Sequence, residues 1–331
     1  MTWIELPNEN KLKVLEEVRT RTGFPLFIIE KDWWVVQTLR LITHINIAQY
    51  TVFKGGTSLS KAWGLIDRFS EDIDLAINRE FFGFSGDISR TQVGKLKDAS
   101  SKYISNDFLF LLQKTFDDAG FNDVHLAVTD EKAPDDDPVK IEVRYPTVTP
   151  YSAYVQPRVL LEIGSRSMIE PTTIRSFRSM IGETFSNLPF ADENIQIRCV
   201  NPERTFLEKL FLLHEEHQRP KEKMKIKGKS RHFYDIYRIA QTEYADKAIA
   251  DNELYKSIVA HRKRFSKLGG VDYTSHFPPN LNPVPPAELM PEWERDYAEI
   301  QGQMIVGENI QFKELIKRTL STIEMINEKW H

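Results

Sequence analysis

The chain has 331 residues with a formal net charge of −4, and 41% of its residues are hydrophobic and 11% aromatic. That much apolar surface can build one large domain or two packed domains, and it excludes a chain that is disordered throughout. The nearly balanced charge excludes a basic field over the whole surface, so any contact with nucleic acid must come from a local patch.

A single cysteine, Cys199, excludes disulfides within the chain and any zinc cage built from cysteines, and it suits a reducing cytosol. The first residues, MTWIELPNEN, lack the basic and apolar regions of a signal peptide. No apolar run approaches the roughly 18–20 residues that cross a membrane. We therefore expect a soluble cytoplasmic protein with no membrane contact.

The first 200 residues alternate between predicted helices and strands, to judge from the spacing of their apolar residues. The predicted helices cover residues 8–22, 30–45, 58–64 and 105–120. The predicted strands cover residues 50–53, 72–77, 123–129, 139–146, 158–166 and 193–200, with an acidic turn at 133–138. Such an order is typical of an α/β (α+β) fold, a mixed sheet flanked by helices.

The remaining residues are predicted to be helical. Asn201 is a good N-cap and Pro202 suits the first helical position. The predicted helices cover residues 203–217 and 232–241, with one or two more between 292 and 329; a basic linker spans 219–231 and a proline-rich surface segment spans 277–291. We therefore expect an α/β domain over residues 1–200 and a helical domain over 201–331.

A glycine pair follows the predicted strand 50–53. Gly55 and Gly56 allow the backbone to approach a ligand closely, and Thr57 and Ser58 begin a helix whose N–H groups could bind phosphate. The spacing fits neither a Walker loop nor a dinucleotide fingerprint. An ordinary tight turn is the alternative interpretation.

Two acids, Asp72 and Asp74, lie two residues apart on a predicted strand, so both side chains face the same side. A divalent cation such as Mg²⁺ would relieve their repulsion and take phosphate oxygens as further ligands. A solvated strand face is the alternative. Glu162 lies among apolar residues and is the best third acid for a two-metal site. Glu142 is the rival, but its charged neighbours favour a solvent-facing, structural role.

This stretch resembles the first motif of the AbiEii/AbiGii family of nucleotidyltransferase toxins, in the DNA polymerase β-like nucleotidyltransferase superfamily. The family pattern is a Gly-Gly-[Thr/Ala]-x-Leu turn followed by an Arg-x-[Ser/Thr]-x-Asp-[Ile/Leu]-Asp strand. Two later stretches, PERTFLEKLFLLH and RHFYDIYRI, are similar to further family motifs and follow in family order. The matching residues are Gly55, Gly56, Thr57, Leu59, Arg68, Ser70, Asp72, Ile73, Asp74, Leu75, Glu208, Lys209, Arg231, Asp235 and Tyr237.

The resemblance implies transfer of a nucleoside monophosphate from an NTP, with Mg²⁺ or Mn²⁺ held by Asp72, Asp74 and Glu162. It implies that the glycine turn with Thr57 or Ser58 cradles the triphosphate. It also groups Arg68, Ser70 and Lys209 with the nucleotide-binding residues, and Lys209 and Asp235 with the catalytic ones, supplied by the helical domain. Asp235 could instead orient Lys209, and Lys54 and Lys61 are secondary phosphate contacts or solvated lysines.

Three other features can each be explained by an ordinary structural role. The HEEH run at 214–217 has its histidines three residues apart, not four, so a zinc site is disfavoured. Cys199 is expected to be a buried core thiol. The basic linker 219–231 could hold RNA phosphates in a salt-sensitive way, although a solvated loop is the usual outcome for such a run.

The resemblance finally implies a toxin of a toxin–antitoxin or phage-defence pair, abortive infection included, with an antitoxin encoded nearby. We expect the acceptor to be RNA, with a tRNA 3′ end preferred. A transferase acting on a small molecule and a nucleotide-binding regulator without turnover are the alternatives.

Overall fold

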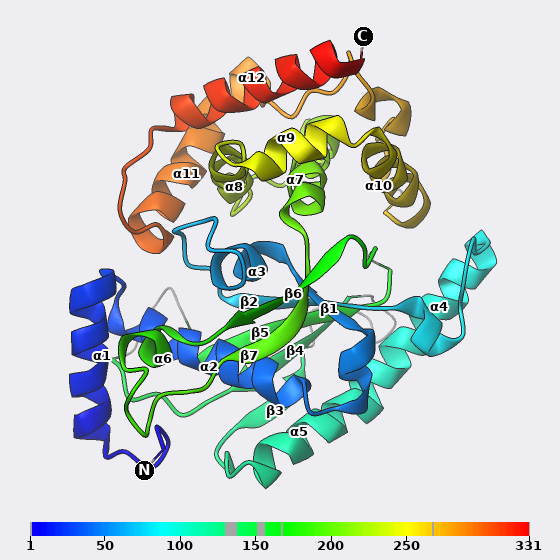
Figure 1. Cartoon of the computed structure of the whole chain (residues 1–331). Coiled ribbons are helices and arrows are strands. Elements are labelled where there is room, and N and C mark those ends of the chain that lie inside the picture. Colours follow the sequence, from blue (N-terminus) through cyan, green and yellow to red (C-terminus); the bar gives the residue numbers. More distant parts are fainter. Residues whose placement is uncertain (1, 130–137, 151–155, 167, 267, 331) are drawn as a thin grey trace. The chain divides into compact units, whose positions relative to one another are not determined.

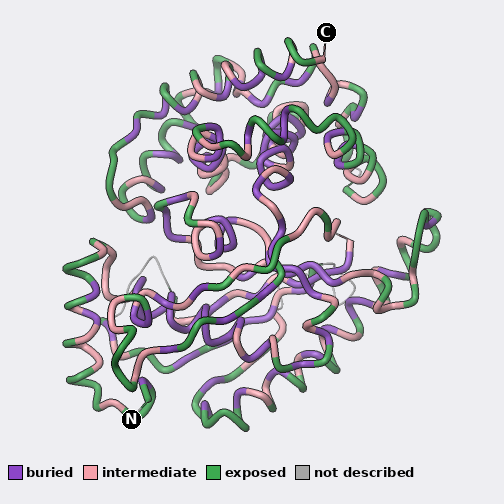
Figure 2. Tube along the Cα trace, in the orientation of Figure 1, coloured by how far each residue is buried: buried purple, intermediate pink, exposed green. Residues whose placement is uncertain are grey.

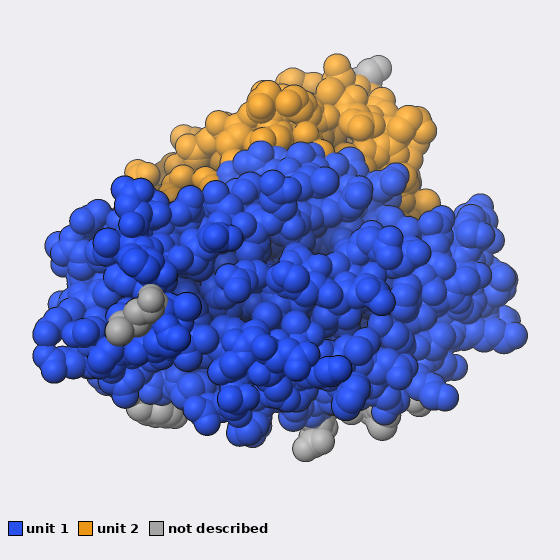
Figure 3. Space-filling view, turned by 60° about the horizontal axis from the view of Figure 1, so that its bottom comes forward, with its two compact units in different colours: residues 1–63, 69–200 blue, residues 64–68, 201–331 orange. Residues whose placement is uncertain are grey.

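The computed structural model describes residues 2–129, 138–150, 156–166, 168–266 and 268–330. The predicted acidic turn at 133–138 lies outside these ranges except for its last residue, Pro138. The chain forms two compact units, one of residues 1–63 and 69–200 and one of residues 64–68 and 201–331 (Figure 3). The short segment 64–68 therefore leaves the first unit and packs with the second.

The first unit is built on a mixed sheet, which confirms the predicted fold class (Figure 1). Within the described residues its seven strands lie in the order β3-β4-β5-β2-β1-β7-β6. The pairs β1–β7 and β2–β5 are parallel and the others are antiparallel. The strands are β1 (Thr51–Lys54), β2 (Asp72–Ile77), β3 (His125–Val128), β4 (Val139–Arg144), β5 (Arg158–Gly164), β6 (Thr172–Phe177) and β7 (Ile195–Val200).

Alternation along the central strands separates a core face from a more polar face. Ile73 and Leu75 of β2 and Leu161 of β5 are buried in the core, whereas Asp74 and Glu162 on the other face are half-buried. Because side chains of a strand alternate between the two faces, the acids are held together on one side. The helices of this unit are α1 (Asn8–Thr22), α2 (Leu26–Ile42), α3 (Gly55–Lys61), α4 (Arg90–Tyr103), α5 (Leu109–Asp118) and α6 (Met180–Thr184).

Helix α2 is buried along almost its whole length (Figure 2). Its apolar side chains belong to the same core as the inward residues of β2 and β5, and α1, α5 and α6 pack around it. A helix enclosed on all sides should be apolar all round. Three consecutive residues of α2, Glu30, Lys31 and Asp32, break that pattern although each is buried.

The second unit is helical, with α7 at its centre (Figure 1). Most residues of α7 are buried, and α8, α9 and α10 pack against it. The segment 64–68 joins this unit through a bridge between Arg68 and Ile305. The helices are α7 (Pro202–His217), α8 (Arg231–Ile239), α9 (Glu243–Ala250), α10 (Asn252–Phe265), α11 (Met290–Met304) and α12 (Phe312–Trp330).

The HEEH run at the end of α7 holds this unit together, as its acids show. Glu215 accepts two hydrogen bonds from Arg262 of α10 and a third from His276. Glu216 accepts from the side chain of Lys229 and the backbone N–H of Lys225, both in the basic linker. The two carboxylates thus anchor α10 and the linker to the central helix.

The proline-rich segment 277–291 runs mostly without regular structure, but it is not a surface segment throughout. Leu281 is buried, and the carbonyl of Asn282 lies 3.1 Å from Nδ1 of His214 on α7. The prediction of an exposed connector is therefore wrong for these residues. A short 3₁₀ turn, Ala287–Leu289, leads into α11.

Several elements were not predicted. These are α4, α6 and β6 in the first unit and α9 and α10 in the second. β6 is an edge strand with few buried side chains, so it lacks the apolar alternation that marks a strand. α3 begins at Gly55 itself and not after the glycine pair, since Gly55 has a φ of +79° and lets the chain turn directly from β1 into the helix. In the described ranges no helix is both long and apolar enough to span a membrane.

Three histidines of the helical unit predict how its stability responds to pH. Burial lowers the pKa of His214 and His232, and it lowers the pKa of His217 to about 4. These imidazoles stay neutral in the folded chain but bind protons in the unfolded chain below about pH 6.5. The free energy of unfolding should therefore fall as the pH drops from about 6.5 towards 4.

The variant His217→Leu should lose part of this pH dependence. The full shift of His217 corresponds to at most about 3 kcal/mol. Urea unfolding at about pH 7 and pH 5 measures the change for the wild type and the variant. An equal loss of stability on acidification in both proteins would contradict the prediction.

Candidate active site

The glycine turn and the first acid pair meet in the first unit. A Cβ built on Gly55 would lie 2.1 Å from Oδ2 of Asp74, so the Asp74 carboxylate rests against the bare backbone of Gly55. Any larger residue at position 55 would displace that carboxylate, and a positive φ of 79° would add backbone strain. Glycine at this position therefore leaves the room that the Asp74 carboxylate occupies.

A row of four charged residues crosses the sheet at this point. Lys54 on β1 is the register partner of Asp74 on β2, which is in turn the partner of Glu162 on β5. Lys140 on β4 completes the row, and its Nζ lies 2.6 Å from Oε1 of Glu162. Because side chains directly opposite one another on neighbouring strands share a face, the two carboxylates lie side by side between two lysines.

Asp72 lies two residues before Asp74 on the same face of β2. Its backbone carbonyl accepts a hydrogen bond of 2.5 Å from Oγ1 of Thr57 in α3, which joins the helix to the beginning of the strand. In the described part of the chain, no three histidine, cysteine or acidic side chains gather closely enough to hold a metal ion. The assignment of Asp72, Asp74 and Glu162 as metal ligands stays a prediction.

The other polar residues near the turn differ in their surroundings. Ser58 is buried beside Cys199, whose pKa burial raises to about 12, so Cys199 is the core thiol that was expected. Lys61 forms an ion pair of 2.8 Å with Asp32 of α2. Ser70 is half-buried just before β2. Phosphate contacts of Thr57 and Lys61 would thus come at the cost of their partners. Contacts of the Gly55 and Gly56 backbone would not, and neither would a contact of the Ser58 hydroxyl, which is buried without a hydrogen-bond partner among the described residues.

Glu142, the rival third acid, has the structural role that its charged neighbours suggested, but the expectation that it faces solvent is wrong. It is buried on β4 and forms ion pairs with Arg144 and Arg158. Lys140 was not foreseen as a neighbour of Glu162, because the register between β4 and β5 cannot be read from either strand alone.

A second group of expected residues meets inside the helical unit. The guanidinium of Arg68 donates two hydrogen bonds to the carboxylate of Asp235, of 2.6 and 2.8 Å. The ammonium of Lys209 lies 2.8 Å from Oδ2 of the same carboxylate. All three residues are buried. The carboxylate of Asp235 thus contacts the ammonium of Lys209, as the alternative role weighed for it requires. The catalytic role of either residue and its contact with nucleotide stay predictions.

Neighbouring charges oppose the effect of burial on the pKa values of Asp235 and Lys209. Burial favours the neutral acid, but the guanidinium of Arg68 and the ammonium of Lys209 together hold the pKa of Asp235 below its usual value. Burial lowers the pKa of Lys209, and Asp235 opposes that change. Nδ1 of His232 lies 3.3 Å from the Lys209 ammonium, and since burial favours the neutral imidazole, this nitrogen can accept from the lysine.

The segment 64–68 is fixed at several points on this unit. The backbone N–H of Asp67 donates to the hydroxyl of Tyr234, and its carboxylate pairs with Arg238 of α8. The carbonyl of Asp67 accepts from the N–H of Val306. Arg68 thus reaches Asp235 from a segment that is itself held by α8.

The sequence model of the nucleotidyl transferase AbiEii toxins of type IV toxin–antitoxin systems matches residues 39–318. The chain belongs to this family. It is thus a nucleotidyltransferase toxin, and a toxin of such a system implies an antitoxin partner.

Among solved structures, MenT4, a nucleotidyltransferase toxin from Mycobacterium tuberculosis H37Rv, is similar with a TM-score of 0.42 and 14% sequence identity. The match covers 94% of this chain and 98% of that one. No curated protein matches the AbiEii-family chain described here.

Gly55→Ala should strongly reduce nucleotidyl transfer by this AbiEii toxin. The added Cβ would meet Oδ2 of Asp74 at 2.1 Å, so the carboxylate must move. We expect a rate loss of roughly a hundredfold, because a displacement of about 1 Å is enough for that. Steady-state transfer rates with a labelled NTP measure it.

Gly94→Ala in α4 is the matched control. A Cβ there would meet nothing within 4 Å, and alanine is the better helix former. Its transfer rate should equal that of the wild type. Full activity in Gly55→Ala would show that the position of Asp74 does not limit the reaction.

Asp235→Asn should destabilise the helical unit. The change leaves Arg68 and Lys209 buried without their carboxylate, and removing one partner of a buried ion pair costs about 3–5 kcal/mol. Asp67→Asn breaks the neighbouring pair with Arg238, but Asp67 is 54% exposed, so its cost should stay below about 1 kcal/mol. Urea unfolding compares the two variants, and equal costs would refute the buried pairing.

Proposed function

We propose that this toxin transfers a nucleoside monophosphate from an NTP to an RNA acceptor, with a divalent cation at Asp72 and Asp74. The observation that carries the proposal is the place of the Asp74 carboxylate, against the Gly55 backbone and beside Glu162 on the neighbouring strand. Phosphoryl-type transfer needs positioning and charge neutralisation more than covalent work by the protein. A glycine turn next to paired carboxylates offers both.

The residues suit Mg²⁺ or Mn²⁺ as the cation. Asp72 and Asp74 present oxygen ligands on one face of β2, and Mg²⁺ is commonly held by one or two carboxylates together with phosphate oxygens. When bound, such an ion neutralises phosphate charge and orients the triphosphate. Glu162 is the third acid of the proposal; it must then exchange the ammonium of Lys140 for the cation.

The chain's own groups complete the proposed nucleotide site. The backbone N–H groups of Gly55 and Gly56 can approach a phosphate closely, because neither residue has a side chain. Thr57 ties α3 to the beginning of β2, which keeps the turn and the acids in register. Lys54 stands beside Asp74 in the row and supplies a positive charge next to the phosphate position.

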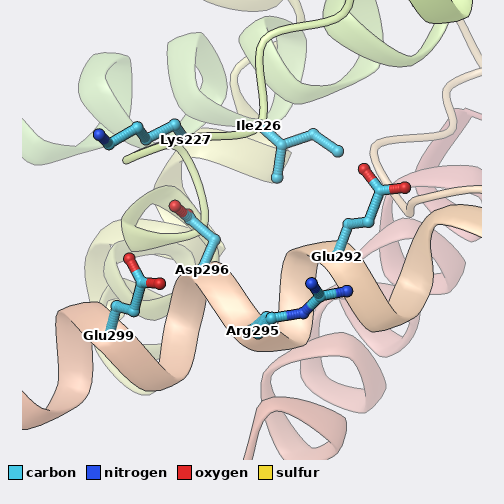
Figure 4. Close-up of a pocket in the computed structure, with 6 residues that line it drawn as sticks. All are labelled: Ile226, Lys227, Glu292, Arg295, Asp296 and Glu299. Atoms are coloured by element: carbon cyan, nitrogen blue, oxygen red, sulfur yellow. The ribbon is translucent and has the colours of Figure 1, made fainter.

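The basic linker supports RNA as the acceptor. Lys221, Lys223, Lys225 and Lys227 are exposed, while the backbone that carries them is held by Glu216 and Asp296. Asp296 of α11 accepts from the N–H of Gly228 and from Ser230. A hollow of about 480 Å³ lies along this part of the linker, lined by Ile226, Lys227, Glu292, Arg295, Asp296 and Glu299 (Figure 4).

Exposed lysines on a fixed backbone attract the phosphates of RNA without regard to sequence. The linker is thus not the freely solvated loop that its composition alone would favour, since carboxylates from α7 and α11 hold it. A tRNA 3′ end is our preferred acceptor. An antitoxin encoded nearby would counter the activity.

The chemistry is tested by incubating the protein with Mg²⁺, each labelled NTP and total RNA. We expect label to enter RNA with the wild type, and Asp74→Asn to lose at least roughly a hundredfold in rate, as for removal of other groups that stabilise charge. Asp123→Asn, an exposed acid of the same unit, is the control that should keep full activity. Label on small molecules alone, or binding of NTP without any transfer, would overturn the proposal.

The acceptor is tested by reversing charges in the linker. Replacing Lys221, Lys223 and Lys227 with glutamate should weaken RNA binding. The slope of the logarithm of the binding constant against the logarithm of the salt concentration should become shallower by roughly 0.7 for each lost phosphate contact. Replacing Lys313, Lys317 and Lys329, three exposed lysines of α12, is the matched control. Equal effects of the two triple variants would show that the linker has no special part in RNA binding.

A further inference from the structure

Three consecutive charged residues are buried in the middle of the α/β unit. Glu30, Lys31 and Asp32 of α2 are each only 2–3% exposed. Successive residues of an α-helix point about 100° apart, so three in a row spread over a wide arc around the helix axis. Charged side chains are almost never fully buried unless they are paired, so the partners of these three show what they do.

Glu30 holds a loop that carries none of the expected site residues. Its carboxylate accepts from the backbone N–H groups of Val148 and Thr149 and from the hydroxyls of Thr147 and Thr149. The bonds to the two hydroxyls measure 2.6 and 2.7 Å. Glu30 is thus a satisfied structural acid.

Lys31 reaches the beginning of the acid-bearing strand. Its ammonium lies 2.5 Å from Oε2 of Glu71, the residue directly before Asp72, and it also donates to the carbonyl of Gln156 just before β5. One buried ammonium therefore ties together the starts of β2 and β5. These are the strands that carry Asp72, Asp74 and Glu162.

Asp32 reaches the helix that follows the glycine turn. Its Oδ1 pairs with the ammonium of Lys61, the last residue of α3, at 2.8 Å. Its Oδ2 accepts from the backbone N–H of Met180 at the start of α6. The two residues after Glu30 thus hold the two elements of the candidate site, β2 and α3, from a single helix.

We infer that Lys31 and Asp32 are positioning residues of the nucleotidyl-transfer site. Lys31 sets the place of the Asp72–Asp74 strand through Glu71, and Asp32 sets the place of α3 and its glycine turn through Lys61. That this site transfers nucleotides rests on the proposed function. The placement of β2 and α3 by Lys31 and Asp32 follows from the packing of this unit alone.

Hydrogen–deuterium exchange tests the positioning without any need for activity. Lys31→Met should speed exchange in peptides covering 70–77, and Asp32→Asn in peptides covering 55–63. Glu30→Gln is the matched control, equally buried on the same helix, and should speed exchange only around 145–150. A uniform rise over all three segments, or none at 70–77 in Lys31→Met, would overturn the inference.

Transfer kinetics test the link to function. We expect Lys31→Met and Glu71→Gln each to lower kcat roughly tenfold, because the acids act on the transition state, while Lys61→Met and Asp32→Asn raise KM for the NTP by a similar factor. Glu30→Gln should keep both constants within about twofold of the wild type when rates are corrected for the folded fraction.

A double-mutant cycle sharpens the first pair. The variant Lys31→Met/Glu71→Gln should lose no more than Lys31→Met alone, since Lys31→Met already removes the contact with Glu71. Additive losses, or losses in Lys31→Met that match Glu30→Gln, would mean a structural role alone and would refute the inference. If the wild type transfers nothing, the proposed function fails by itself, and the exchange pattern still decides whether Lys31 and Asp32 position these segments.

Discussion

A charge taken out of water must find a partner, and this requirement organises both units. In the helical unit the carboxylate of Asp235 lies between the guanidinium of Arg68 and the ammonium of Lys209, with bonds of 2.6 to 2.8 Å. In the α/β unit three consecutive charges of α2 are satisfied by three separate segments. Apolar packing could build either core, but it would not select which segments meet there.

These paired charges also separate two kinds of acid in the same fold. Glu142, Glu215 and Glu216 are enclosed by cations and hold elements together. Asp74 lies against a glycine backbone on the half-buried face of the sheet, a position that serves a ligand better than it serves the core. The contrast is one of surroundings, since all four side chains have the same functional group.

The sequence was enough to predict the mixed sheet, the strand with the two acids and the glycine turn before it. Each of these has a local signal: alternation in 72–77, and two glycines after a short apolar run. Contacts between residues that are far apart in the chain have no such local signal and could not be predicted. The pairing of Arg68 with Asp235 joins residues far apart in the chain, and the neighbour of Glu162 depends on the register between two strands.

Helix α2 is a second case in which the sequence alone does not predict the surroundings of its charged residues. Its apolar residues predict a buried helix, but the charges at 30–32 would be placed on a solvated face by composition alone. Only the arrangement of the other segments shows that Glu71, Lys61 and the loop at 147–149 supply their partners.

The segment 64–68 has a consequence for how this protein can be divided. Since it belongs with the helical unit, the chain passes from one unit to the other after residues 63, 68 and 200. A cut at 200 would place Arg68 on one fragment and Asp235 on the other, so neither piece would carry a complete set of buried charges. A fragment that begins at residue 201 is therefore not the whole helical unit, because it lacks residues 64–68 and with them the guanidinium that faces Asp235.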